Sequence, residues 1–257
     1  QNIANVGNEA YARREAPISQ VKSASDALQI SNSGGYGVKI DGITRAFDEF
    51  IEVQLQNAAS GFAFSTSQAT VLNQLEQVIR PSQGSVSQRL QELFSSFNIV
   101  AQDPSDLAAR HVAVDNGKAL VASIVNVADG ISDLRNFVSQ NILNNVSEAN
   151  GVLQQLAQIQ TELLGNETIT NAPNELLDQR DLLLKELSEL VDITVDYTSG
   201  GMVNISIGTA GQGKTLLSGT VYSNLVVQQT DGVSKVFLDN ENSGGLSKIQ
   251  IQSGKIS

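Results

Sequence analysis

No proline interrupts the chain between Pro104 and Pro173, and the apolar residues of that stretch recur at helical spacing. The heptad series and the residues that extend it are Leu107, Val114, Val121, Ala128, Ile124, Ile131, Val138, Leu153, Leu156, Ile159 and Leu163. Because proline breaks helices and three-, four- and seven-residue spacing marks one helix face, the pattern predicts one long helix with a buried seam. About 60 residues at roughly 1.5 Å each give a rod of about 90 Å. A chain that holds such a rod must fold into an elongated body.

Three glycines lie inside this predicted helix, and each weakens it. Gly117, Gly130 and Gly151 each cost about 1 kcal/mol relative to alanine in a helix interior. Asparagine is also a poor helix former, so Asn150 and Gly151 together are the weakest point of the rod. If the helix breaks anywhere, we expect the break there.

The start of the rod carries a helix-initiation signal. Asp103 is predicted to cap the helix, with Pro104 in its first turn, where a missing N–H costs nothing. Asp106 then places a carboxylate near the positive end of the helix dipole. The rod is therefore expected to restart after a tight connection from a preceding helix.

Two shorter helices are predicted before the rod and one after it. The first has an apolar stripe and ends at Pro81 and Gly84; the stripe consists of Phe47, Phe50, Ile51, Leu55, Ala58, Leu72, Leu75 and Ile79. The inward residues expected in the second are Val86, Leu90, Leu93, Phe94 and Phe97. The third begins at Pro173 and has Asp181 four residues before Lys185 on a polar face. Its apolar face consists of Leu176, Leu177, Leu183, Leu184, Leu187 and Leu190.

After Val191 the apolar residues alternate, which is typical of strands. The predicted strands are Ile193–Tyr197, Val203–Ile207, Leu225–Val227 and Lys235–Leu238. The glycine-rich Ser199–Gly201 marks a turn between the first two. At the other end of the chain, residues 1–33 are polar and predict an extended arm, and Gly37–Ile43 alternates like a strand.

Together these patterns predict an α+β fold: an elongated, rod-like helical domain with long antiparallel helices, followed by a β-rich domain. Residues 1–46 are expected to form an extended arm and a short strand that pack on the rod. Residues 47–192 are expected to form the long-helix domain, and residues 193–257 an incomplete β-rich domain.

Composition excludes several classes of function. The net charge of −11 argues against binding to nucleic acid and to anionic membranes, because their phosphates would be repelled. No apolar run approaches the roughly 18 residues of a membrane span, and no cleavable signal peptide is visible at the start. The absence of cysteine rules out disulfides, thiolate catalysis and cysteine-based metal sites.

One motif suggests nucleotide chemistry. Gly208–Thr215 fits the G-x-x-x-x-G-K-[ST] pattern of a phosphate-binding loop, which requires a strand before it and a helix after it. The following residues, Leu216–Thr220, are too short and too close to a turn for that helix. We therefore interpret the motif as a glycine-rich hairpin loop and expect no cofactor. A nucleotide-binding protein that uses this loop remains the alternative hypothesis.

Other polar residues do not form a catalytic set. His111 is the only histidine, so it lacks the partners that a metal site or a serine nucleophile needs. Four carboxylates on the helix after Pro173 share it with Arg180 and Lys185, and we expect a solvated, salt-bridged face there. These carboxylates are Asp178, Asp181, Glu186 and Glu189. No catalytic, cofactor-binding or metal-binding residue is predicted, and the chain is not expected to be an enzyme.

Three segments, in order along the chain, resemble one protein family. Asn2-Ile3-Ala4-Asn5-Val6 with Tyr11-Ala12-Arg13 is similar to the N-I-A-N-V…G-Y-x-R signature of flagellar rod, hook and hook-associated proteins, although Ala10 stands where that family usually has glycine. Gly37–Arg45 with Phe47–Phe50 resembles the strand-to-helix entry of the same family. Asn174–Leu187, which contains the motif L-L-D-Q-R-D, resembles the hook-associated protein 1 family, whose members join the bacterial hook to the filament.

The resemblance implies a structural subunit of the bacterial flagellum at the junction between hook and filament. It implies self-assembly into a ring or helical layer, contact with the hook protein and with the second junction protein, and an export chaperone bound through a C-terminal part beyond residue 257. It further implies an extracellular location reached without a cleavable signal peptide. The residues implied in assembly are Asn2, Ile3, Asn5, Tyr11 and Arg13. Because the family places helices before and after the matched region, we expect the chain alone to remain monomeric.

Overall fold

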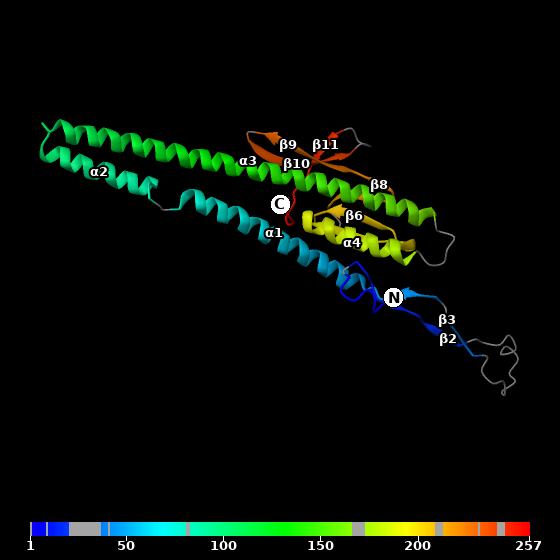
Figure 1. Ribbon diagram of the computed structural model, residues 1–257. Helices are drawn as coiled ribbons and strands as arrows, with labels where there is room; N and C mark the ends of the chain where they lie inside the picture. The colour runs from blue at the N-terminus through cyan, green and yellow to red at the C-terminus, as the bar shows by residue number, and fades with distance from the viewer. Residues whose placement is uncertain are drawn as a thin grey trace, which may run out of the picture.

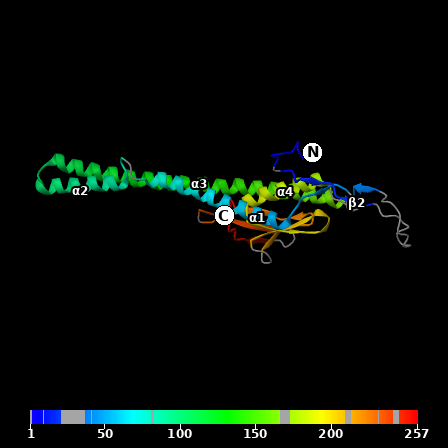
Figure 2. The same ribbon diagram turned by 90° about the horizontal axis from the view of Figure 1, so that it is seen from below.

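The structure is a computed structural model that describes residues 2–8, 10–20, 37–40, 42–80, 83–165, 173–208, 213–230, 232–240 and 245–257. Four helices run along one long axis, and two antiparallel sheets cover one end of the longest helix (Figure 1). The turned view shows the same elongated outline, with a helical hairpin extending away from the sheets (Figure 2). The α+β prediction of a helical rod followed by strands is therefore confirmed.

The helices are α1 (Glu49–Ile79), α2 (Val86–Gln102), α3 (Leu107–Gly165) and α4 (Asn174–Leu190). At 59 residues, α3 is about 90 Å long. It passes through Asn150 and Gly151 without interruption, so the predicted long helix is continuous through its predicted weakest point. Tertiary contacts explain the continuity, because Val152 and Leu153 on the next turn are buried and Asn150 bonds to a strand.

Helix α3 is capped by Asp106 and not, as expected, by Asp103. The Asp106 carboxylate accepts hydrogen bonds from the N–H groups of Ala108 and Ala109, at 2.8 and 3.2 Å. Asp103 instead accepts from the N–H and the hydroxyl of Ser105, which closes the turn between α2 and α3 and lowers the pKa of Asp103. Pro104 lies in that turn and not in the first turn of the helix.

The apolar stripes expected in α1 and α2 are not buried. Phe50 is 71% exposed and Phe94 61%, whereas the buried positions of these helices are occupied by Gln56, Ser60 and Ala63 in α1 and by Ser96 in α2. Ser60, Ala63 and Ser96 are small enough to let neighbouring segments approach closely, and Gln56 donates to the Tyr197 hydroxyl at 3.3 Å, while the bulky residues flank these contacts. The predicted end of α1 is right in position, since the helix stops at Ile79; Pro81 lies outside the described residues.

The predicted burial of the heptad seam is confirmed for the second half of α3 and is wrong for the first half. Leu153, Leu156, Ile159 and Leu163 are all at most 8% exposed. In the first half, Val121 is 61% exposed, and the other exposed seam residues are Leu107, Val114, Ile124 and Ile131. There the buried residues of α3 are Ala113 and Ser123. One partner helix covers only a narrow strip, so a wide apolar face stays open.

Gly130 shows why one helix-weakening glycine lies in the rod. A β-carbon at this position would lie 2.9 Å from Cγ1 of Val78 on α1. Glycine therefore lets the end of α1 approach α3, and this packing offsets the roughly 1 kcal/mol that glycine costs in a helix.

The strands after α4 form two antiparallel sheets. The four-stranded sheet has the order β5-β6-β7-β8 and the three-stranded sheet the order β11-β10-β9. Their bounds are β5 (Ile193–Tyr197), β6 (Val203–Ile207), β7 (Lys214–Ser218), β8 (Val221–Tyr222), β9 (Asn224–Thr230), β10 (Val233–Asn240) and β11 (Gly245–Lys248). All four predicted strands are confirmed, and the turn predicted at Ser199–Gly201 is a short 3₁₀ segment, η2.

One hydrophobic core joins helices and sheets. It runs from Val146 on α3 through α4 to both sheets, and its fully buried members include Leu156, Leu184, Leu217 and Leu238. The last described segment closes this core from the side: the N–H of Gly254 donates to the Ser60 carbonyl, and the N–H of Ile256 donates to that of Leu190. A β-carbon at Gly254 would lie 2.6 Å from the Leu190 oxygen, so glycine is required there.

The N-terminal arm forms two small ribbons. Strand β1 (Arg14–Glu15) pairs with β4 (Thr44–Arg45), and β2 (Ile18–Gln20) pairs with β3 (Val38–Ile40), both antiparallel. The prediction of a strand within 37–43 is confirmed for 38–40. The second ribbon projects away from the body beyond the start of α1 (Figure 1). No helix in the described ranges is long and apolar enough to cross a membrane.

Candidate assembly site: the anchor of the N-terminal arm

The polar face of α4 is buried around Asp178 and Arg180, which corrects the expectation of a solvated face there; further along the helix, Glu186 is exposed and Glu189 pairs with Lys255 at 3.4 Å, as expected. Asp178 is 8% exposed and Arg180 only 3%. Arg180 donates from Nε to the Asp181 carboxylate at 2.8 Å and from Nη1 to the carbonyl of Gly201. Burying charges is costly unless they are paired, so a cluster of this kind must have partners on other elements.

The partners come from the N-terminal arm. Arg14 on β1 reaches Asp178 with Nη2 to Oδ2 at 2.6 Å, and Arg45 on β4 reaches Asp178 with Nε to Oδ1 at 2.8 Å. Arg45 also pairs with Asp181. The carboxylate of Asp178 therefore holds both strands of the first ribbon at once. We call Arg14, Arg45, Asp178, Arg180 and Asp181 the arm anchor.

Aromatic rings enclose the arm anchor. The Arg180 guanidinium lies 5.8 Å from the ring centre of Phe47 and 5.1 Å from that of Tyr197, within cation–π range. The two rings meet edge to face at 5.3 Å. Burial raises the pKa of Tyr197 to about 12. Burial, together with the nearby Asp181 carboxylate, raises the pKa of Glu52.

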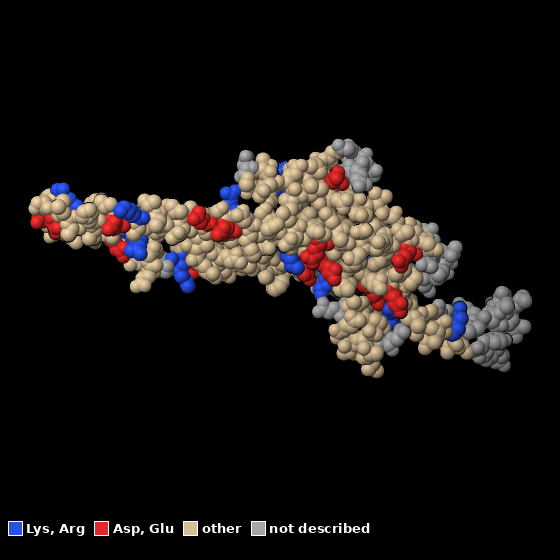
Figure 3. Space-filling view, turned by 45° about the horizontal axis from the view of Figure 1, so that its top comes forward, with Lys and Arg blue, Asp and Glu red and all other residues tan. Residues whose placement is uncertain are grey.

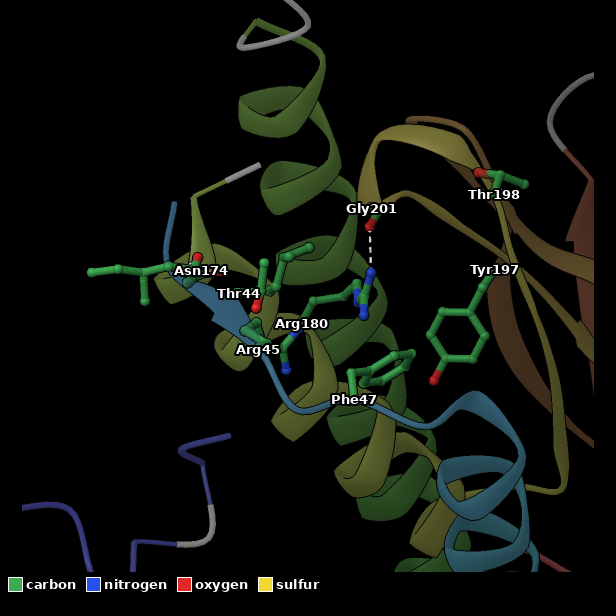
Figure 4. Close-up of a pocket in the computed structure, with 10 residues that line it drawn as sticks. Thr44, Arg45, Phe47, Asn174, Arg180, Tyr197, Thr198 and Gly201 are labelled. Carbon is green, nitrogen blue, oxygen red and sulfur yellow. Dashed lines mark hydrogen bonds between the residues drawn. The ribbon is translucent and has the colours of Figure 1, made fainter. Parts of the chain in front are cut away.

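A cavity of about 280 Å³ opens beside the arm anchor. Figure 4 shows Thr44 and Arg45 approaching from the arm, Arg180 pointing toward Gly201, and the rings of Phe47 and Tyr197 on one side. The cavity therefore lies where arm, α4 and β region meet. Among the described residues that line it, none form a nucleophile–base pair, and the contacts there are ionic and aromatic.

Two of the five residues implied in assembly lie next to the arm anchor. Oδ1 of Asn2 accepts hydrogen bonds from the Tyr11 hydroxyl at 2.9 Å and from the Arg14 N–H at 3.0 Å. Nδ2 of Asn2 donates to the Arg14 carbonyl at 2.9 Å. The Arg14 guanidinium lies 5.1 Å from the Tyr11 ring centre. Asn2 and Tyr11 thus fix the residue that carries the ion pair.

The other three residues are placed differently. Ile3 is 91% exposed, and Arg13 lies at the surface paired with Glu15. Asn5 accepts from Asn8 within the first turn, at 3.3 Å. The structure thus separates Asn2 and Tyr11, which hold the arm, from Ile3 and Arg13, which face outward, while Asn5 is half-buried.

Sequence reasoning missed Arg14, Arg45 and Arg180. Arg14 was indistinguishable from its neighbour Arg13, and only the alternation of a strand, which sends adjacent side chains to opposite faces, could have separated them. For Arg180, the signal was its position among buried leucines: Leu183, Leu184 and Leu187 lie three, four and seven residues on, so it shares their helix face.

The glycine-rich motif does not have the context of a phosphate-binding loop. Lys214 and Thr215 belong to β7, which pairs antiparallel with β6. A strand therefore follows where phosphate binding needs a helix N-terminus, and the hairpin interpretation fits; residues 209–212 lie outside the described residues. His111 is exposed on α3. Among the residues that the structure describes, no group of three or more His, Cys, Asp or Glu side chains could hold a metal ion.

Fold and arm anchor together define a class: an elongated α+β protein in which a long helical hairpin carries a β region and an N-terminal arm is tied back to it. The flagellar hook-associated protein FlgK helical domain family matches residues 72–257, well over half of the chain. The chain therefore belongs to the FlgK family of flagellar hook-associated proteins.

Individual relatives agree with this family. The chain is 27% identical over 221 residues to flagellar hook-associated protein 1 of Salmonella typhimurium, covering 85% of this chain and 39% of the relative. It is 26% identical over 207 residues to the protein of the same name from Bacillus subtilis, covering 78% and 40%. The chain thus spans about two fifths of the length of these relatives.

A solved structure shows the same fold. It is described as the flagellar hook junction protein FlgK from Burkholderia pseudomallei and superimposes with a TM-score of 0.70 at 22% identity. The similarity covers 79% of this chain and 37% of that one.

Proposed function

We propose that this chain is part of a structural subunit of the bacterial flagellum that forms the junction between hook and filament. The observation that carries the proposal is the family match across residues 72–257, which falls on the rod and its attached sheets. An elongated body suits repeated head-to-tail contacts, which generate rings or helical layers. The function is structural, not enzymatic, and its place is the flagellum outside the cell, reached by export without signal cleavage.

The proposed partners follow from this position: further copies of the same protein, the hook protein, the second junction protein and an export chaperone. We also propose that the chain is divided into three functional parts. Residues 1–46 form the arm, 47–192 the long-helix domain and 193–257 the β-rich domain. The net charge of −11 fits contacts with proteins and not with nucleic acid.

The N-terminal arm is the proposed assembly element. Asn2, Tyr11 and the arm anchor orient it on the body, while Ile3 and Val6, 91% and 83% exposed, face outward. The outward residues of the signature, Ile3, Val6 and Arg13, are then exposed to neighbouring subunits. Apolar side chains this exposed gain most from burial against a partner.

The test is genetic. In a bacterium that carries the gene, deletion is expected to leave hooks without filaments and flagellin shed into the medium. Full-length protein with Ile3→Asp and Val6→Asp should be exported yet fail to restore filaments, whereas Ala16→Asp, at an exposed position of the same arm outside the signature, should restore them. Filaments on the deletion strain would overturn the proposal, and filaments with the double variant would overturn the role of the arm.

A further inference from the structure

Two side-chain amides on α3 each bond to both backbone groups of a single strand residue. Asn150 donates from Nδ2 to the Leu225 carbonyl at 2.9 Å and accepts at Oδ1 from the Leu225 N–H at 2.8 Å. Gln160 does the same with Val203: Nε2 donates to the carbonyl and Oε1 accepts from the N–H, both at 2.9 Å. An amide side chain used in this way replaces a neighbouring strand.

Each amide covers a place where its sheet has no further strand. Strand β9 is the outer strand of the order β11-β10-β9, so Leu225 directs its free backbone groups toward α3. Strand β6 lies between β5 and β7, but its pairing with β7 begins only at Ile205, so Val203 lies beyond that pairing. Gln160 is fully buried, and losing one such partner leaves buried N–H and carbonyl groups unpaired.

The two amides belong to different sheets but to one rigid helix. They lie ten residues apart, which is about 15 Å along the axis and roughly 80° around it. Hydrophobic packing has no direction, so it restricts the rotation of the sheets relative to α3 only weakly. Two pairs of directional hydrogen bonds at separate points restrict that rotation more strongly. We infer that Asn150 and Gln160 form a two-point joint in which each amide sets the orientation of its own sheet on the rod.

The biological consequence rests on the proposed function. In an assembled layer, the joint would fix the angle at which each subunit presents its β region to its neighbours. Asn150 and Gln160 are positioning residues in this sense. The joint itself is a property of the isolated chain, so it can be tested apart from any flagellum.

The absence of cysteine makes paired spin labels straightforward to introduce. One label at Asn126 on α3 is combined with a second at Gln228 on β9 or at Asp196 on β5; all three positions are exposed. Asn150→Asp and Gln160→Glu keep shape but remove the donor. Asn150→Asp is expected to broaden the distance distribution to Gln228 about twofold, and Gln160→Glu that to Asp196, because each loses one of its two bonds to the strand and sets a carboxylate oxygen against the strand carbonyl.

The matched controls are Asn144→Asp and Gln158→Glu, which make the same changes at exposed positions of α3. They should leave both distributions unchanged. Unchanged widths in the joint variants, with native circular dichroism, would overturn the inference.

A second measurement needs no variant. Hydrogen exchange of the Leu225 N–H should be at least about tenfold slower than that of Val227, the next N–H on the same open edge of β9. Equal rates would show that Asn150 does not hold the sheet. If either variant broadened both distance distributions, the two sheets would move as one unit. That result would also contradict the inference that each amide holds its own sheet independently.

Discussion

The two ends of α3 share one helix and one kind of sequence pattern but have opposite surroundings. We call the region built on Val146–Leu163, α4 and both sheets the body, and α2 with the earlier part of α3 the distal rod. In the body, Leu153 and Leu156 are fully buried, whereas Val114 and Val121 in the distal rod are 55% and 61% exposed. Apolar spacing therefore specifies a helix face, but only a covering layer makes that face a core.

The surface reflects the same contrast. In the space-filling view, charged side chains are sparse over most of the visible face, and the acidic groups of the body lie close to basic ones near the arm (Figure 3). Helix α1 has no charged residue from Val53 to Leu75. Near the arm, the body thus holds its charges in pairs, while α1 and the distal rod leave apolar residues at the surface.

The largest expected effect comes from a matched pair of aspartate substitutions, one in the body and one in the distal rod. Leu156→Asp places an unpaired charge in the shared core and is expected to destabilise the body by on the order of 4 kcal/mol. Because helices and sheets share that core, thermal unfolding followed by circular dichroism should show both signals lost together at lower temperature. Loss of the helical signal alone would show that the sheets fold independently.

Val121→Asp is the partner substitution in the distal rod. The heptad pattern assigned Val121 to a buried seam, but its exposure predicts a change of only about 0.5 kcal/mol or less. A large loss of stability would mean that this surface is covered in solution.

The next effect concerns the arm. Asp178→Asn removes one charge from the arm anchor and leaves Arg14 and Arg45 short of a counter-ion, at a cost of about 3 kcal/mol. Hydrogen exchange should accelerate in residues 10–20 and 44–45 more than in the sheets. Glu175→Gln, the same loss of charge at an exposed position of α4, is the control and should leave exchange unchanged.

Local rules predicted the elements well, and contacts between distant segments explain the failures. The strands 193–197 and 203–207 and the leucine face of α4 follow from alternation and helical spacing alone. The buried state of Arg180 does not, because its partners Phe47 and Tyr197 come from other elements. From the sequence of a helix alone, a charged side chain is expected to be solvated. Here the N-terminal arm packs over the charged residues of α4, and local spacing does not predict that contact.

A smaller, pH-dependent effect distinguishes the two regions without a core substitution. The pKa of Tyr197 is raised to about 12 by burial, whereas an unfolded tyrosine ionises near pH 10. Between these values the unfolded chain loses a proton that the folded chain keeps, so stability falls as pH rises from 10 to 12. Tyr197→Phe should reduce this alkaline loss, as measured by denaturant unfolding at pH 8 and pH 11. An identical pH dependence in both proteins would show that the ring is solvated.

The arm anchor shows a further limit of prediction from sequence. Asn2 and Tyr11 could be singled out because they belong to a signature, and both contact Arg14. Nothing local links Arg14 to Asp178, which is 164 residues away. Pairs this distant in sequence are set by topology, which local spacing does not encode.

The smallest effect is expected at the tip of the distal rod. Asp106→Ala removes the acceptor for two N–H groups at the start of α3, and losing such a cap costs about 1 kcal/mol. Few buried contacts hold the distal rod together, since its buried residues are Ser96, Ala113 and Ser123. The loss should therefore appear as fraying there and not as a lower melting temperature of the body.

Hydrogen exchange of residues 107–112, compared with that of residues 150–163, measures this difference. Exchange should accelerate in the first range and stay unchanged in the second. Ser95→Ala on α2 is the matched control, because its side chain is exposed and lies in the interior of the helix, away from both helix ends. If Asp106→Ala accelerated exchange equally in both ranges, the rod and the body would unfold as one unit, and the contrast between them would concern only surface exposure.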